Sequence, residues 1–141
     1  METSQRPVIF LAEDNAADVE LFRMALENAA VTCELKVFLD GHAILEYVRG
    51  YETAKDRAKP ELIIMDLNLP KIDGVEVLRM IRNVPGFQKV PYAVISCSSS
   101  FRDRDKLAGY NIVAYIVKST DLDEYMKIGG TVRNLLSEVS C

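Results

Sequence analysis

The chain has 141 residues and a mass of 15.8 kDa, with 49% hydrophobic and 27% charged residues, which corresponds to one ordinary globular domain. Acidic residues outnumber basic ones 21 to 17, and the net charge of −4 argues against binding to nucleic acid or an anionic membrane through bulk charge. The apolar runs fall far short of the ~20 residues that a membrane-spanning helix needs, and the polar N-terminus does not resemble a signal peptide. We therefore expect a cytoplasmic protein without a membrane partner.

Cysteine and histidine content limits the chemistry that this chain can perform. Cys33, Cys97 and Cys141 form no CxxC pair, and their odd number fits a reducing cytosol better than a disulfide framework. His42 is the only histidine, which argues against a histidine-based zinc site or a Ser–His catalytic triad. Any chemistry must therefore rest on carboxylates, hydroxyls and lysine.

Short apolar runs alternate along the chain with segments of helical periodicity. The runs predict strands at residues 8–12, 33–39, 62–65, 92–95 and 112–117. Four of them are continuously apolar, as in parallel strands that are covered on both faces. The second alternates polar and apolar residues, a pattern typical of a half-exposed edge strand.

Helical segments follow each predicted strand. We expect a helix after Asn15, helices at residues 41–49 and 74–84, a fourth between Ser98–Ser100 and Gly109, and a last one from about Asp121 with Glu124 in the capping position. The inward faces are predicted to carry Val19, Phe22, Leu26 and Ala29 in the first helix, and Leu122, Tyr125, Ile128, Val132, Leu135 and Val139 in the last. Gly129 and Gly130 predict a weak point in the last helix, because each Gly costs about 1 kcal/mol relative to Ala.

The alternation of strands and helices predicts an α/β fold, a doubly wound parallel sheet of five βα units. Two strand orders are common for such sheets, and the edge character of the second strand favours the order 2-1-3-4-5. In that order the chain reverses direction between strands 1 and 3, and ligands bind beyond the carboxyl ends of the strands at this point.

Polar side chains follow four of the predicted strands. They are Glu13 and Asp14 after the first strand, Asp66 after the third, Ser96 after the fourth and Lys118 after the fifth. Each has an ordinary explanation by itself, since Asp14 could cap a helix, Ser96 could belong to a turn and Lys118 could be a solvated surface residue. Their joint placement favours a site, because the carboxyl ends of parallel strands meet at one edge of the sheet.

Three carboxylates at one edge require a compensating charge. Two carboxylates ~4 Å apart repel each other by about 4 kcal/mol at an effective dielectric constant of 20. Oxygen ligands without histidine or thiolate suit Mg²⁺, which binds one or two carboxylates and shares phosphate oxygens. Lys118 and Ser96 could contact a phosphoryl group, and aspartate can carry one covalently. The residues predict Mg²⁺-assisted phosphorylation of one aspartate.

These residues resemble the receiver domain of bacterial two-component response regulators over residues 7–139. The motifs are Glu13-Asp14, Met65-Asp66, Asn68-Leu69-Pro70, Asp73-Gly74, Ser96 and Tyr115-Ile116-Val117-Lys118. The resemblance implies a flavodoxin-like fold and a phosphoacceptor, Asp66, that attacks a phosphohistidine on a sensor histidine kinase or phosphotransfer protein. It further implies that Glu13, Asp14, Asp66 and the backbone carbonyl of Asn68 hold Mg²⁺, that Lys118 and Ser96 bind the phosphoryl group, and that Tyr115 changes rotamer when Ser96 moves.

The chain departs from the family pattern at several positions. Glu13 stands where Asp is commoner, and Ser96 stands where Thr is commoner. Ser119 replaces the proline that follows the lysine through a cis bond, so we expect a trans bond here, because a cis bond before serine would cost ~2.5–4 kcal/mol.

Together with the segment 67–71 and the polar stretch 50–60, the missing proline resembles the stand-alone regulators associated with bacterial phytochromes. That resemblance implies a homodimer through the fifth strand and the last two helices. The alternative is that the flanking helices simply cover the fifth strand.

We expect residues 1–141 to form a single receiver domain without an output domain, because almost nothing follows the last helix. Such a protein is not an enzyme beyond self-phosphorylation and autodephosphorylation, and its output lies in protein–protein interaction or phosphorelay. One alternative is a binding module of the same fold that does not use phosphate. Another is an aspartyl-phosphate phosphatase, for which Asn68 cannot supply the second acid.

Overall fold

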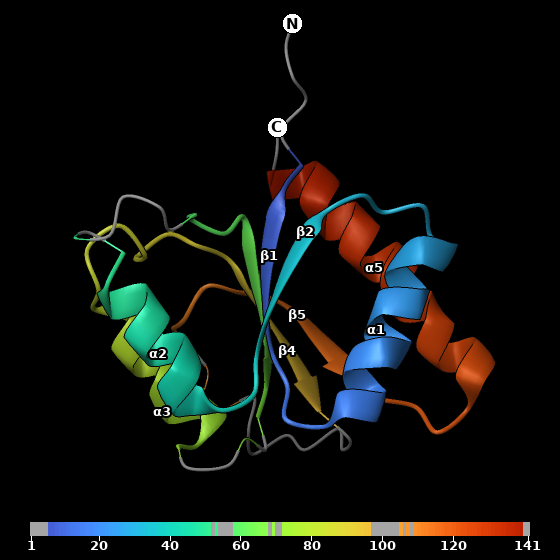
Figure 1. Cartoon of the computed structure of the whole chain (residues 1–141), viewed down its shortest axis with the longest axis horizontal. Coiled ribbons are helices and arrows are strands. Elements are labelled where there is room, and N and C mark those ends of the chain that lie inside the picture. The colour runs from blue at the N-terminus through green and yellow to red at the C-terminus, as the bar shows by residue number, and fades with distance from the viewer. Residues whose placement is uncertain are drawn as a thin grey trace, which may run out of the picture.

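The computed structural model describes residues 6–51, 53, 58–67, 69, 72–96, 105, 107 and 109–139, with side chains described as far as residue 137. The elements are β1 (Val8–Ala12), α1 (Ala16–Asn28), β2 (Glu34–Phe38), α2 (Gly41–Arg49), β3 (Leu62–Asp66), α3 (Gly74–Arg82), β4 (Tyr92–Ser96), β5 (Ile112–Val117) and α5 (Leu122–Val139) (Figure 1). The predicted fourth helix falls largely outside the described residues.

The five strands form one parallel sheet in the order β2-β1-β3-β4-β5. The α/β fold and the strand order predicted from the sequence are therefore confirmed, with β2 at an edge. β2 spans 34–38 rather than 33–39, because β1 offers five residues for pairing. β3 and β4 each extend one residue further than predicted, since Asp66 pairs with Ile95 and Ser96 pairs with Val117.

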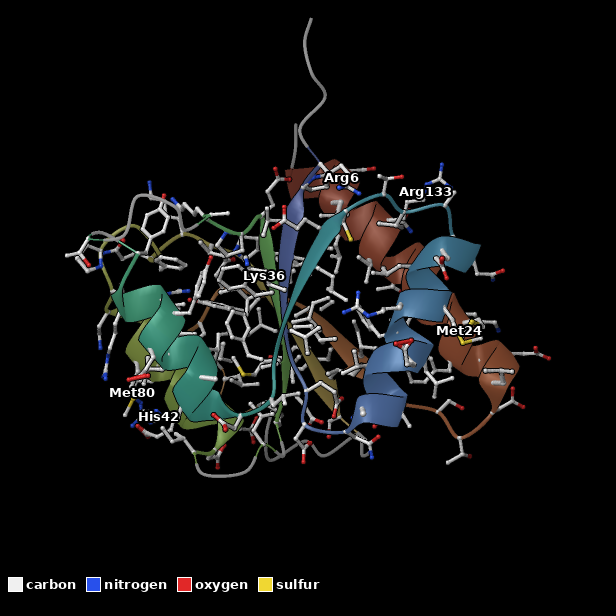
Figure 2. All side chains as sticks on the ribbon, in the orientation of Figure 1. Arg6, Met24, Lys36, His42, Met80 and Arg133 are labelled. Carbon is white, nitrogen blue, oxygen red and sulfur yellow. The ribbon has the colours of Figure 1, made fainter. Side chains whose placement is uncertain are left out.

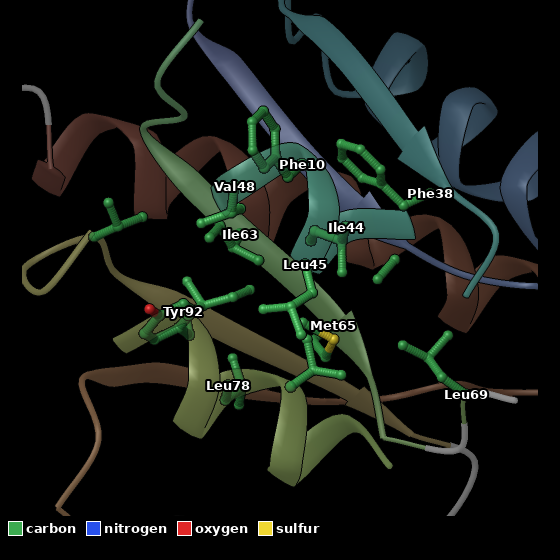
Figure 3. Close-up of a cluster of buried hydrophobic side chains, with 14 of the residues drawn as sticks. Phe10, Phe38, Ile44, Leu45, Val48, Ile63, Met65, Leu69, Leu78 and Tyr92 are labelled. Atoms are coloured by element: carbon green, nitrogen blue, oxygen red, sulfur yellow. The ribbon is translucent and has the colours of Figure 1, made fainter. Parts of the chain in front are cut away.

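Helices α1 and α5 cover one face of the sheet, and α2 and α3 cover the other (Figure 1). Successive strand residues point to opposite faces, so Phe10 packs towards α2 and α3 while Ile9 and Leu11 pack towards α1 and α5. Figure 3 shows the α2–α3 cluster, in which Ile63 and Tyr92 are fully buried. Burying each such side chain contributes about 1.5–3 kcal/mol, and both clusters hold the strand ends in place.

Side-chain caps fix where the helices begin. Asn15 Oδ1 accepts hydrogen bonds from the backbone N–H groups of Ala17 and Asp18 at 2.9 and 3.1 Å. Asn15 therefore caps α1, and the alternative that Asp14 serves as the cap is excluded. At α5, Asp121 Oδ1 accepts from the N–H of Glu124 at 3.1 Å, which agrees with the predicted start of this helix.

Helix α3 is two residues shorter at its C-terminus than predicted. The helix ends at Arg82 rather than Val84, because the N–H groups of Asn83 and Val84 bond to carbonyls only three residues back, at Met80 and Ile81. These tighter turns close the helix.

The α1–α5 contact corrects the interpretation of the paired glycines. A Cβ atom on Gly129 would overlap the carbonyl oxygen of Ala25 in α1, whereas a Cβ on Gly130 would meet no atom within 4 Å. Gly129 is therefore a point of close approach between the helices rather than only a weak point. Arg133 extends this contact by donating from Nη1 to the carbonyl oxygen of Ala29 at 3.2 Å (Figure 2).

Two predictions of burial were wrong, those for Leu122 and Ala29. Tyr125, Ile128, Val132 and Leu135 are buried as predicted, but Leu122 is exposed. The Tyr125 hydroxyl already reaches the first turn of α1, so Leu122, one turn earlier, lies beyond the end of that helix. Ala29 is only half-buried, because it is the C-cap of α1.

For β5 the sequence left two outcomes open, an uncovered edge or a strand covered by the flanking helices, and the structure favours the first. Val113, Tyr115 and Val117 are 38–49% exposed. β5 is the edge strand beside β4, and among the described helices α2 and α3 pack over the strands nearer the centre of the sheet. Within the described part of the chain, no helix is long and apolar enough to cross a membrane.

Candidate functional site

The carboxyl ends of four neighbouring strands bring the predicted site residues to one edge of the sheet, the lower edge in Figure 1. Glu13 directly follows β1, Asp66 and Ser96 end β3 and β4, and Lys118 directly follows β5. Glu13, Asp66 and Ser96 are the buried polar residues of the described chain. The convergence that the sequence predicted for these four residues is thus present.

The ammonium group of Lys118 lies at the centre of the site. Its Nζ atom is 2.6 Å from Glu13 Oε1, 2.9 Å from Asp66 Oδ2 and 3.0 Å from Asp18 Oδ2. A lysine ammonium has three N–H donors, so these three carboxylates can accept all of them. The Lys118 side chain is only 8% exposed, and water therefore screens these ion pairs weakly.

Burial and charge shift the proton affinities of the site. Burial lowers the pKa of Lys118, but hydrogen bonds to Glu13, Asp66 and Asp18 outweigh it and raise the pKa above its ordinary value. Burial raises the pKa of Glu13, against the hydrogen bonds from Lys118 and from the Asn15 N–H. Lys118 therefore stays cationic at neutral pH and is outnumbered by carboxylates.

The acidic residues fit a hard divalent cation. Carboxylate oxygens of Glu13, Asp14 and Asp66 all lie within 4.8 Å of one another. Oxygen donors without histidine or thiolate are the set that Mg²⁺ and similar cations prefer. Asp14 is exposed and does not cap α1, so its carboxylate remains available to a cation. The predicted backbone ligand, Asn68, lies outside the described residues.

The loop after β5 also follows the prediction. Within the described chain no peptide bond is cis, so the bond between Lys118 and Ser119 is trans. The Lys118 N–H donates to the carbonyl oxygen of Ser96 at 2.7 Å, which joins the ends of β4 and β5. Tyr115 lies earlier on β5, opposite Val94, with a partly exposed side chain.

The start of α3 packs tightly beneath the phosphoacceptor candidate. A Cβ on Gly74 would lie 2.9 Å from both the carbonyl oxygen of Asp66 and the Cα of Leu67. The Gly74 N–H also donates to the carbonyl of Leu67 at 3.4 Å. Only glycine permits this approach, which fixes the backbone that carries Asp66.

Asp18 is a site residue that the sequence reasoning missed. The sequence placed it only in the first turn of a helix, whereas its carboxylate contacts Lys118 across a separation of 100 residues. One signal could have found it: Asp18 lies one helical turn after Asp14, in a helix that begins at the same edge of the sheet.

Comparison with known proteins decides the family. Residues 9–128 match the response regulator receiver domain. The chain belongs to this family. The receiver domain is 33% identical to the response regulator Rcp1 of Synechocystis sp. over 129 residues, which cover 90% of this chain and 86% of Rcp1. It is 31% identical to the probable methanogenesis regulatory protein FilR2 of Methanothrix harundinacea, over 88% of this chain and 79% of FilR2.

Solved structures agree with this assignment. The phosphorylated cyanobacterial phytochrome response regulator RcpA superposes with a TM-score of 0.83 at 35% identity, over 96% of each chain. The Mn²⁺-bound form of Rcp1 superposes with a TM-score of 0.79 at 30% identity, over 91% of this chain and 92% of that one. The receiver domain is therefore a two-component signalling domain of a family that works with histidine kinases or phosphotransfer proteins, and it carries the acidic pocket typical of phosphorylation and divalent metal binding.

Proposed function

We propose that this receiver domain accepts a phosphoryl group on Asp66, with Mg²⁺ as the metal and a sensor histidine kinase or phosphotransfer protein as the donor. The observation that carries the proposal is the 2.9 Å contact between Lys118 Nζ and Asp66 Oδ2, beside the carboxylates of Glu13 and Asp14. A phosphoryl group on Asp66 would meet a buried cation on one side and metal-binding oxygens on the other.

In the proposed reaction a carboxylate oxygen of Asp66 attacks the phosphorus of a phosphohistidine. The new P–O bond forms as the P–N bond breaks, and the electron pair of that bond stays on the departing imidazole nitrogen. Glu13, Asp14, Asp66 and the carbonyl of Asn68 would hold Mg²⁺, which neutralises charge on the phosphoryl oxygens. Self-phosphorylation from a small phosphodonor and hydrolysis by water would use the same centre.

The switch is proposed to rest on Lys118, Ser96 and Tyr115. Phosphorylation adds nearly two negative charges and three acceptor oxygens. Lys118 and the Ser96 hydroxyl would donate to these oxygens and favour one of two packings of β4 and β5, with Tyr115 changing rotamer. The hydrogen bond from the Lys118 backbone N–H to the Ser96 carbonyl oxygen supports a concerted movement of the two residues.

Intact-mass measurement after incubation with acetyl phosphate and Mg²⁺ tests the phosphoacceptor. We expect one phosphate on the wild type, none on Asp66→Asn, and one on Asp123→Asn, a control that removes an exposed carboxylate from α5. Labelled Asp66→Asn would contradict the assignment. An unlabelled wild type would instead favour a phosphate-independent binding module.

The donor is proposed to be a phytochrome-type sensor kinase, because RcpA is a phytochrome response regulator. Phosphotransfer from a phytochrome-type kinase should be faster than transfer from a histidine kinase of another class. Equal rates would remove this proposal.

One continuous sheet supports a single receiver domain over residues 1–141, and the cysteine pattern supports a cytoplasmic setting.

We also propose a homodimer through β5 and the flanking helices. Val113, Tyr115 and Val117 on β5 and Leu122 at the start of α5 are large exposed apolar or aromatic side chains. Sedimentation velocity with and without beryllofluoride, a phosphoryl mimic, should reveal a dimer that Val117→Glu disrupts. Met24→Glu, at an exposed position on α1, is the control. A monomer in both states would contradict this interface.

A further inference from the structure

The three carboxylates around Lys118 are not equivalent. Glu13 and Asp66 belong to the cluster whose oxygens lie within 4.8 Å of one another together with Asp14. Asp18 is outside that cluster, yet its Oδ2 atom is 3.0 Å from Lys118 Nζ, nearly as close as Asp66 Oδ2 at 2.9 Å.

A metal ion and a phosphoryl group would change the partners of Lys118. Glu13 and Asp66 would turn their oxygens to the cation, and Asp66 would lose its negative charge on forming an acyl phosphate. Both groups would then be weaker acceptors for the ammonium. Asp18 would keep its full charge, because it has no part in either event.

Hydrogen bonds hold the backbone that carries the Asp18 carboxylate. Asp18 lies in the first turn of α1, where its N–H donates to the Asn15 cap at 3.1 Å and its carbonyl accepts from the Tyr125 hydroxyl at 3.3 Å. Its side chain is 27% exposed. The close approach of Gly129 to Ala25 packs α1 against α5, so the backbone that carries the Asp18 carboxylate is held by both helices.

We propose that Asp18 is a positioning residue, which keeps the Lys118 ammonium directed at the phosphoryl group when Glu13 and Asp66 are engaged elsewhere. This inference rests on the proposed function. It also extends the site into α1 and α5, because the residue that anchors Lys118 is itself held by both helices.

Binding of beryllofluoride at saturating Mg²⁺, followed by NMR, tests the inference. Loss of the anchor in Asp18→Asn should weaken beryllofluoride binding by about tenfold, which corresponds to 1.4 kcal/mol at 25 °C. Charge alone predicts the opposite change in affinity, because removing a nearby negative charge should strengthen the binding of an anion such as beryllofluoride. The control Glu20→Gln removes an exposed carboxylate of α1 that does not contact Lys118, and this variant should bind beryllofluoride as tightly as the wild type. Asp18→Glu restores the negative charge and should recover part of the lost affinity.

Unchanged or tighter binding by Asp18→Asn would overturn the inference. A second measurement uses the wild type alone: a hydrogen-bond coupling between Lys118 ¹⁵Nζ and Asp18 ¹³Cγ should persist in the Mg²⁺–beryllofluoride state, and its loss there would also overturn it. A wild type that binds no beryllofluoride would instead contradict the proposed function. The two failures are therefore distinguishable.

Discussion

The backbone N–H of Lys118 donates a 2.7 Å hydrogen bond to the carbonyl oxygen of Ser96. This bond joins the two residues proposed to bind the phosphoryl group, at the ends of two adjacent strands. A displacement of Ser96 towards a phosphoryl oxygen would therefore be accompanied by a displacement of the segment that carries Lys118.

The first prediction concerns the switch. Lys118→Met should still be phosphorylated by acetyl phosphate, though more slowly, because Asp66 and the metal ligands are intact. The response should be lost, so the amide chemical shifts of β4 and β5 should not change with beryllofluoride. Lys127→Met, at an exposed position on α5, should respond like the wild type. A normal response of Lys118→Met would contradict the role of this lysine.

The second prediction concerns metal and stability. Mg²⁺ at a hundredfold excess over its Kd should raise the free energy of unfolding by about 2.7 kcal/mol. Asp14→Asn should lose most of this gain in thermal or urea unfolding, whereas Asp123→Asn should keep it.

Lys118→Met should be about 3 kcal/mol less stable than the wild type without metal, because the buried carboxylates lose their counterion. Mg²⁺ should then stabilise it more than the wild type, and a smaller effect would contradict this electrostatic account.

The third prediction uses the adjacent glycines of α5 as a matched pair. Gly129→Ala should destabilise the protein by about 2 kcal/mol, because the methyl group would force α5 away from Ala25. Gly130→Ala should stabilise it by up to about 1 kcal/mol, because the methyl group meets no atom and alanine favours the helix. Urea unfolding measures both. Equal effects would show that helix propensity, not the α1–α5 contact, governs these positions.

The fourth prediction concerns alkaline pH. Burial raises the pKa of Tyr92 to about 12, with the charge of Arg82 opposing it, and burial together with the charge of Asp18 raises the pKa of Tyr125 to about 12. Unfolded tyrosine loses its proton near pH 10, so the unfolded state binds fewer protons between about pH 10 and 12. The free energy of unfolding should therefore fall as the pH rises through this range, with the full contribution present below it.

Urea unfolding at pH 9 to 12 measures this fall, and tyrosinate absorbance reports the ionisation. Tyr92→Phe and Tyr125→Phe should each reduce the slope. A slope that neither variant changes would show that other groups cause the alkaline loss of stability.

The sequence predicted those features that follow from strand ends and local capping. Apolar runs located the strands, and the rule that parallel strands share one carboxyl edge predicted that Glu13, Asp66, Ser96 and Lys118 lie together. The alternating pattern of residues 33–39 placed β2 at the edge. These features depend on short-range periodicity and on a small set of sheet topologies.

Features that depend on how helices pack were not predictable in the same way. Asp18 reaches Lys118 only because the first turn of α1 lies beside the residue that follows β5, and Gly129 permits the close approach of α5 to α1. Periodicity shows which face of α5 is apolar but not how far the contact extends. Leu122 was therefore predicted to be buried, although the first turn of α1 does not extend as far as this residue.

Arg133 provides, from α5, the basic group that the C-terminal turn of α1 does not contain. The last turn of α1 contains no basic residue, and the Arg133 guanidinium donates to the exposed carbonyl of Ala29. Helix α1 is thus bonded to α5 at both of its ends, by Tyr125 and Asp18 near the site and by Arg133 and Ala29 at the opposite end. We therefore expect the amide protons of α1 and of α5 between Tyr125 and Arg133 to exchange with solvent as one cooperative unit, and a protein that binds either helix would stabilise both.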